Sequence, residues 1–129
     1  MTALARVRLV AVLLLGAGIL VGCTAGSGAG GPPPSAPPGG AVVTAAELRF
    51  DRTQLDVPAG RPFTLLFENR EGPPHNVRIY DDVVDQPLFV GEVFSGPGAR
   101  SYEVPAIPAG AHRFRCDVHP EMSGTVTAR

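Results

Sequence analysis

The sequence predicts an all-β domain, a Greek-key sandwich or barrel, because short apolar runs alternate with a period of two and turn residues separate them. From Phe63 to Phe67 the odd positions are strongly apolar, as expected for a strand with one buried face. No window after residue 41 keeps a helical period for long. Pro and Gly cluster between the apolar runs, at positions 58–60, 71–74, 95–98 and 108–110.

Each further strand is expected from the same alternation. In the run that ends at Cys116, Phe114 faces the core while Arg113 and Arg115 face outward. Segment 81–98 is irregular and begins with several aspartates, so it is expected to be a long connection. The predicted strands are 63–67, 75–79, 100–104, 112–116 and a last one near 122–128 that carries Val126 inward.

Size and charge limit the possible functions. The chain has 129 residues, of which 88 (42–129) remain after an apolar N-terminal run and a segment rich in Gly, Pro, Ser and Ala. This length is enough for one small domain and excludes a multidomain enzyme. From residue 42 onward there are 9 arginines, no lysine and 12 acidic residues, a net charge of −3. Nucleic-acid binding, which needs a concentrated basic face, is therefore not expected.

The N-terminus has the pattern of an export signal. Arg6 and Arg8 precede an uncharged apolar run from Leu9 to Val21, which is too short to span a bilayer comfortably. The run ends in Leu20-Val21-Gly22-Cys23, which resembles the lipobox of bacterial lipoproteins. The resemblance implies a signal peptide over residues 1–22 and lipid attachment at Cys23. The alternative is an ordinary cleaved signal with an incidental cysteine.

A linker is expected between this signal and the domain. Residues 24–41 carry no charge and no large apolar side chain, so the segment cannot bury a core and is expected to be disordered. We therefore expect three parts: a signal peptide (1–22), a lipidated cysteine with its tether (23–41), and a folded domain (42–129).

The residues with the most specific chemistry lie near the C-terminus. Cys116, His119 and Met122 are spaced three residues apart, too closely for a continuing strand, so a loop must gather their side chains. His75 begins another predicted strand, and its parity points it to the same side as the core. Two histidines, one cysteine and a weakly bound methionine are the ligand set of a mononuclear blue-copper site.

With these four residues the domain resembles the cupredoxins, the type 1 blue-copper family, in its amicyanin or plastocyanin form. The segment Pro74-His75-Asn76-Val77 matches the family's first histidine, and the spacing C-x2-H-x2-M, with Pro120 after the histidine, matches the short loop of the amicyanin type. The resemblance implies one copper ion held by His75, Cys116, His119 and Met122.

The resemblance also implies roles for the neighbouring residues. The family's asparagine after the first histidine donates its backbone N–H to the thiolate, and its side chain ties that strand to the ligand loop; here it is Asn76. Pro74 and Pro120 would stiffen the two ligand segments, since proline fixes its own φ and restricts the residue before it.

Purely structural roles account less well for the four residues. A lone buried cysteine is usually an inert thiol, and Met122 alone would usually be core packing. A disulfide is disfavoured because the only partner for Cys116 is Cys23, beyond the tether. His112 lies roughly 13 Å along the strand from Cys116, so it is expected to be a core or edge histidine. The acids Asp81, Asp82 and Asp85 are expected to form a solvated loop rather than a calcium site.

The expected function is that of an electron carrier, not an enzyme. We expect a monomer, lipid-anchored to the outer, periplasmic side of a bacterial cell membrane, that exchanges electrons with a redox protein such as a cytochrome, oxidase or dehydrogenase. His119 is the expected route for electrons, and Asp117 and Glu121 are expected to steer a basic partner. The alternative is copper storage, scavenging or delivery without electron transfer.

Overall fold

The computed structural model describes residues 35–129, and these form β-strands without any helix. Among them there is consequently no helix with the length and apolar character needed to cross a membrane. The strands in chain order are β1 (Ala41–Ala46), β2 (Arg49–Phe50), β3 (Gln54–Val57), β4 (Phe63–Asn69), β5 (Pro74–His75), β6 (Arg78–Asp81), β7 (Gln86–Val90), β8 (Phe94–Ser95), β9 (Gly98–Val104), β10 (Gly110–Arg115) and β11 (Ser123–Ala128).

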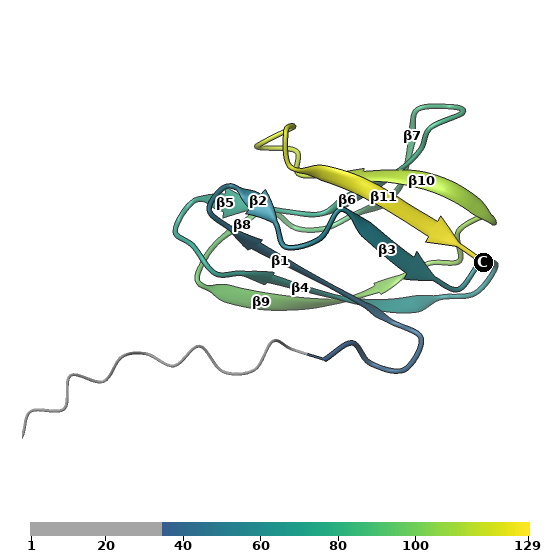
Figure 1. Cartoon of the computed structure of the whole chain (residues 1–129), viewed down its shortest axis with the longest axis horizontal. Helices are drawn as coiled ribbons and strands as arrows, with labels where there is room; N and C mark the ends of the chain where they lie inside the picture. The colour runs from purple at the N-terminus through teal and green to yellow at the C-terminus, as the bar shows by residue number, and fades with distance from the viewer. Residues whose placement is uncertain (1–34) are drawn as a thin grey trace, which may run out of the picture. The chain divides into compact units, whose positions relative to one another are not determined.

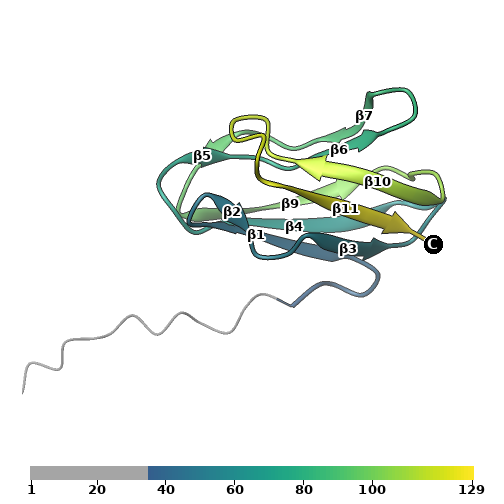
Figure 2. The same cartoon turned by 45° about the horizontal axis from the view of Figure 1, so that its top comes forward.

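Two sheets pack face to face, which confirms the predicted all-β sandwich. One sheet has the order β2-β1-β4-β9 and the other the order β3-β11-β10-β6-β7, while β5 pairs with β8. Figures 1 and 2 show β1, β4 and β9 in one layer and β10, β11 and β6 in the other. The pairs β1–β4 and β3–β11 are parallel, so the chain crosses between the sheets rather than folding only as hairpins.

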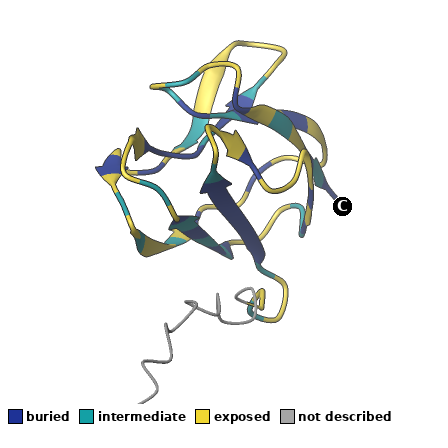
Figure 3. Cartoon of the chain, turned by 60° about the vertical axis from the view of Figure 1, so that its left-hand side comes forward, coloured by how far each residue is buried: buried dark blue, intermediate teal, exposed yellow. Residues whose placement is uncertain are grey.

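The alternation that predicted the strands follows from burial on one face. In β4 every second residue from Phe63 to Asn69 is buried, and in β10 His112 and Phe114 are buried while Arg113 is exposed. Strand β1 differs, because five of its six residues are buried, and Figure 3 shows this strand in dark blue. It begins at Ala41, one residue before the expected start of the domain.

The expectation that segment 81–98 is only a long connection is wrong. Strand β7 lies within it and pairs with β6 at the edge of the larger sheet, and β8 lies beside β5. Sequence alternation could not reveal β7, because none of its residues is fully buried and Pro87 interrupts the pattern. An edge strand with little burial leaves almost no period of two to detect.

Four phenylalanines join the two sheets in the core. Phe114 of β10 lies 5.3 Å, between ring centroids, from Phe50 of β2, and Phe50 lies 6.3 Å from Phe67 of β4. Phe67 in turn lies 5.6 Å from Phe94 of β8. Each aromatic pair contributes roughly 0.5–1.5 kcal/mol beyond burial alone. Because Phe114 is two residues before Cys116, this chain of rings supports the strand end from which the cysteine projects.

Substituting Gly124 by alanine is expected to destabilise the metal-free domain by about 1–3 kcal/mol, because the new methyl group would overpack the core. Its Cβ would lie 2.5 Å from both the Phe114 ring and the carbonyl oxygen of Thr53. Gly72→Ala is the control, since a Cβ there would meet nothing within 4 Å. Denaturant unfolding of both variants measures the difference, and equal midpoints would contradict the packing argument.

Candidate metal centre

His75 is held in place by a tightly bonded segment between β4 and β5. The buried side chain of Asn69 donates from Nδ2 to the carbonyl oxygens of Pro73 (2.9 Å) and Phe94 (3.1 Å). Its Oδ1 accepts the backbone N–H of Glu71 at 3.0 Å. One amide therefore ties both sides of the turn before His75 to β8, and the imidazole of His75 is fully buried.

The loop between β10 and β11 is closed by its own backbone. The N–H of Cys116 donates to the carbonyl oxygen of Met122, and the N–H of Met122 donates to that of His119, both at 2.9 Å. This loop is yellow in Figure 1 and lies at the same end of the domain as β5, an arrangement also visible in Figure 2. The tight spacing of Cys116, His119 and Met122 thus forms a compact turn, as predicted.

Three potential ligand atoms converge between these two segments. The Cys116 sulfur lies 3.8 Å from Nδ1 of His75, and the two Nδ1 atoms of His75 and His119 lie 3.1 Å apart. One ligand atom from each residue lies within 4.8 Å of the others, close enough to bind one metal ion. Cys116 and His75 are fully buried, whereas His119 is partly exposed.

Glu71 determines which nitrogen of His75 faces this cluster. Its Oε1 lies 2.9 Å from Nε2 of His75 and also accepts the backbone N–H of Leu48 at 2.9 Å. The hydrogen bond from Leu48 is the main cause that lowers the pKa of Glu71, and His75 lowers it further against the effect of burial. An ionised carboxylate only accepts hydrogen bonds, so Nε2 carries the proton and the lone pair of Nδ1 points to the cluster.

The same carboxylate supports a strained turn. Glu47 and Leu48 form the two-residue turn between β1 and β2, with φ values of 54° and 56° that are unusual for residues other than glycine. Turns with two positive φ values suit the twist of a hairpin but favour Asn and Gly at these positions. The hydrogen bond from Leu48 to Glu71 helps to stabilise this conformation, so the turn and the His75 imidazole share one acceptor.

Comparison with known proteins gives the family. The family model for the cupredoxin-like domain matches residues 13–128. The chain belongs to the cupredoxin family. Amicyanin of Paracoccus denitrificans is 31% identical over 85 residues, which are 66% of this chain and 62% of that protein, so the chain spans less than two thirds of this relative's length.

Solved cupredoxin structures resemble this domain. Amicyanin from Paracoccus versutus is 28% identical, with a TM-score of 0.56 over 72% of this chain and 84% of that one. Auracyanin from Roseiflexus castenholzii superimposes with a TM-score of 0.63 over 74% of this chain and 99% of that chain. At 18% identity, the likeness to auracyanin shows the fold alone.

The donor set fits the cofactor of the family. Cupredoxins bind one copper, and they are generally electron carriers rather than enzymes. A buried thiolate with two imidazole nitrogens is a soft ligand set that suits copper. Nitrogen and sulfur ligands lie about 2.0–2.3 Å from a first-row metal ion, so donors 3.1 and 3.8 Å apart are compatible with one ion between them.

The remaining predicted site residues are placed as follows. Met122 is buried and belongs to the hydrophobic core, so its axial ligation stays a prediction. Pro120 is exposed next to His119. The Asn76 side chain does tie the two ligand segments, since it accepts the Asp117 N–H and donates to the Asp117 carboxylate, both at 2.8 Å. Its backbone bond to the thiolate stays a prediction. The expected lipidation site, Cys23, lies outside the described residues.

His112 is a core histidine, as expected. It is 6% exposed, its Nε2 lies 2.8 Å from the carbonyl oxygen of Pro108, and it is not part of the donor cluster. Asp82 and Asp85 are exposed after β6 and lie within 3.5 Å of Arg113, whereas Asp81 is the last residue of β6 and half-buried. The expectation of a solvated loop is confirmed for Asp82 and Asp85 and is wrong for Asp81, which belongs to the strand.

Sequence reasoning missed Glu71 and the partner of Asp117. Glu71 lies four residues before His75 in an irregular turn, where no periodicity relates one side chain to another. Asp117 pairs with Arg78 at 3.0 Å and a quarter of its side chain is exposed, while its expected role in steering a partner stays a prediction. The acid immediately after Cys116 was the available signal, but its partner on β6 could not be identified from the sequence.

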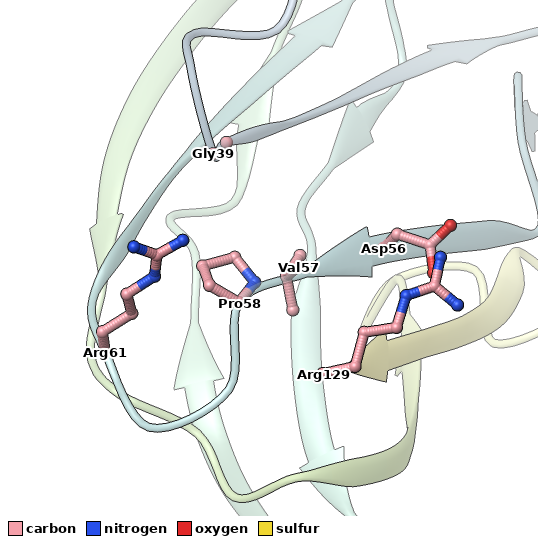
Figure 4. Close-up of a pocket in the computed structure, with 7 residues that line it drawn as sticks. Gly39, Asp56, Val57, Pro58, Arg61 and Arg129 are labelled. Atoms are coloured by element: carbon pink, nitrogen blue, oxygen red, sulfur yellow. The ribbon is translucent and has the colours of Figure 1, made fainter.

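A shallow pocket lies elsewhere on the domain. Its lining comes from the segment before β1, the end of β3 with the residues after it, and Arg129 after β11. Figure 4 shows Arg129 reaching toward Asp56, to which it is paired at 3.1 Å. None of the donor residues lines it.

Proposed function

We propose that this protein is a blue-copper electron carrier that transfers one electron at a time through a single copper bound by Cys116, His75 and His119, with Met122 as the axial ligand. The convergence of one buried thiol and two imidazoles is the observation that carries the proposal. Likeness to amicyanin, whose solved structures include a Cu(I) form at 28% identity, supports the choice of metal.

The chain's own groups supply rigidity and an exit route. The Nε2 of His75 is fixed by Glu71, and the Cys116 thiol is held at the end of β10, so both ligands can keep their positions when the charge of the metal changes. His119 is partly exposed, and its sequence neighbours Val118 (42% exposed) and Pro120 are exposed, as is Pro74 next to His75. A partner that docks on this apolar surface would approach the copper through the His119 ring.

The cellular setting is part of the same proposal. An N-terminal signal ending at Gly22 and a lipid on Cys23 would tether the domain to the outer face of a bacterial membrane, since more than one acyl chain gives stable anchoring. The partner would be a redox protein such as a cytochrome, oxidase or dehydrogenase. We propose no enzymatic reaction, because the sequence lacks the H-x-H pair and the C-x3-C pair that copper oxidase centres use.

Adding Cu(II) to the purified protein is expected to produce an intense visible thiolate-to-copper charge-transfer band that saturates at one equivalent. Voltammetry of this form should then be reversible, because the ligands are held by hydrogen bonds that do not depend on the metal. A colourless product would refute the blue-copper site. A blue protein that gives up its copper readily to an apo-acceptor and cycles irreversibly would instead indicate copper delivery.

A further inference from the structure

Asp117 lies between the two segments that carry the potential copper ligands. It follows Cys116 directly, and its contacts are all to the segment that follows His75. Its backbone N–H donates to Oδ1 of Asn76, and its Oδ2 accepts from Nδ2 of Asn76, both at 2.8 Å. The two residues adjoining the ligands in sequence are thus joined by a closed pair of hydrogen bonds.

The other carboxylate oxygen extends this connection to β6. Oδ1 of Asp117 accepts from a guanidinium nitrogen of Arg78 at 3.0 Å and from the hydroxyl of Tyr80 at 3.2 Å. Three side-chain donors therefore converge on two oxygens, which requires a group that only accepts hydrogen bonds. An ionised carboxylate meets this requirement, and an amide of the same shape does not.

A cluster of arginines around Tyr80 supports this carboxylate. Arg115 donates from Nε to the Tyr80 hydroxyl at 2.9 Å, and its guanidinium lies 4.6 Å from the Tyr80 ring centroid. Arg78 and Arg113 lie 5.5 and 5.2 Å from the same centroid. The hydrogen bond to Tyr80 and the charge of Asp117 raise the pKa of Arg78 against the effect of burial. The hydroxyl is thus held where it can donate to Asp117.

We propose that Asp117 is a positioning residue of the copper site, whose carboxylate locks the Cys116–His119 loop onto the His75 segment through Asn76, Arg78 and Tyr80. This inference rests on the proposed function for the identity of the metal. The ion pair is partly buried, with side-chain exposures of 30% for Arg78 and 25% for Asp117, so solvent screens it less than a pair on the open surface. Without the carboxylate, only one of the two hydrogen bonds between residues 117 and 76 would remain, the one from the backbone N–H of residue 117 to the Asn76 side chain.

Asp117→Ala is expected to lower the copper affinity about tenfold, as is usual when a group that orients metal ligands is removed. The affinity is measured by competition with a copper chelator. Glu121→Ala is the matched control, because Glu121 is exposed in the same loop and its loss removes the same charge. The control should bind copper within about twofold of the wild type, as expected for a surface substitution.

The second measurement needs no metal. In the apo-protein the backbone N–H groups of Cys116 and Met122 close the loop, so their hydrogen exchange reports its opening. We expect exchange about tenfold faster in Asp117→Ala and unchanged in Glu121→Ala, since loop opening is a local event. Because this readout does not involve copper, it tests Asp117 even if the wild type fails to bind the metal and the proposed function is wrong.

Asp117→Asn covers the case in which the alanine variant does not fold. Its amide can accept at only one atom, so one of the three donors would face an NH2 group, and the affinity should fall by an intermediate, about threefold, amount. Wild-type exchange rates and copper affinity in the substituted proteins would overturn the proposal. So would equal effects of Asp117→Ala and Glu121→Ala, because the cause would then be charge alone.

Discussion

Replacing Cys116 by serine is expected to abolish the visible charge-transfer band of the copper-loaded protein. The thiolate is the only sulfur donor in the cluster of His75, Cys116 and His119, and the band arises from electron transfer between this sulfur and the metal. A serine hydroxyl is a hard, protonated group at neutral pH and cannot replace it. The measurement is the visible spectrum after addition of one equivalent of Cu(II).

Two controls separate this loss from general damage. Serine differs little in shape from cysteine, so the far-UV circular dichroism of the apo-protein should be retained, although a buried hydroxyl without a partner costs about 1–3 kcal/mol. Val118→Ala changes an exposed residue of the same loop and should leave the band in place. A band that persists in Cys116→Ser would show that the metal is bound somewhere else.

Removing the carboxylate of Glu71 is expected to lower the copper affinity about 10–100-fold, the usual range for groups that hydrogen-bond a ligand histidine. In Glu71→Ala the Nε2 proton of His75 loses its acceptor at 2.9 Å. The imidazole can then adopt the other tautomer, with the proton on Nδ1, which blocks the nitrogen that faces Cys116. The N–H of Leu48 also loses its partner, so the turn at Glu47 and Leu48 should loosen.

Glutamine at position 71 distinguishes the hydrogen bond from the charge. Both bonds use the same oxygen of Glu71, and an amide oxygen can accept both. Glu71→Gln is therefore expected to keep the affinity within about threefold of the wild type, because it loses charge but not the acceptor. Glu103→Ala, an exposed acid on β9, serves as the surface control. An affinity in Glu71→Ala equal to that of this control would refute the orienting role.

The site shows why a small domain can bind a metal rigidly. Three polar side chains, Asn69, Glu71 and Asn76, lie at or beyond the ends of strands. Each makes at least two hydrogen bonds to other turns, loops or strands of the domain. Below them the aromatic chain from Phe94 to Phe114 fills the space between the sheets. The ligands are consequently held by contacts that exist without the metal, which suits a site that must accept two oxidation states.

Local patterns in the sequence were sufficient for the fold class and for part of the site. Alternation predicted β4, β9, β10 and β11, because each has one face toward the core, and strand parity alone put Cys116 and His112 inside. The three-residue spacing of Cys116, His119 and Met122 required a turn. Strand parity also pointed His75 to the core side, and the resemblance to cupredoxins added Asn76 as the connection between segments. The structure places both beside the loop.

Only the tertiary structure revealed the partners of these residues. Parity tells which face a residue occupies but not which strand lies across from it, so the pairing of Asp117 with Arg78, 39 positions earlier, could not be inferred. Glu71 lies in a turn with no repeating geometry, and its bond to His75 depends on how Asn69 shapes that turn. Strand β7 was missed because it buries little surface. Short-range periodicity records burial, whereas hydrogen bonds between distant loops depend on the complete packing of both sheets.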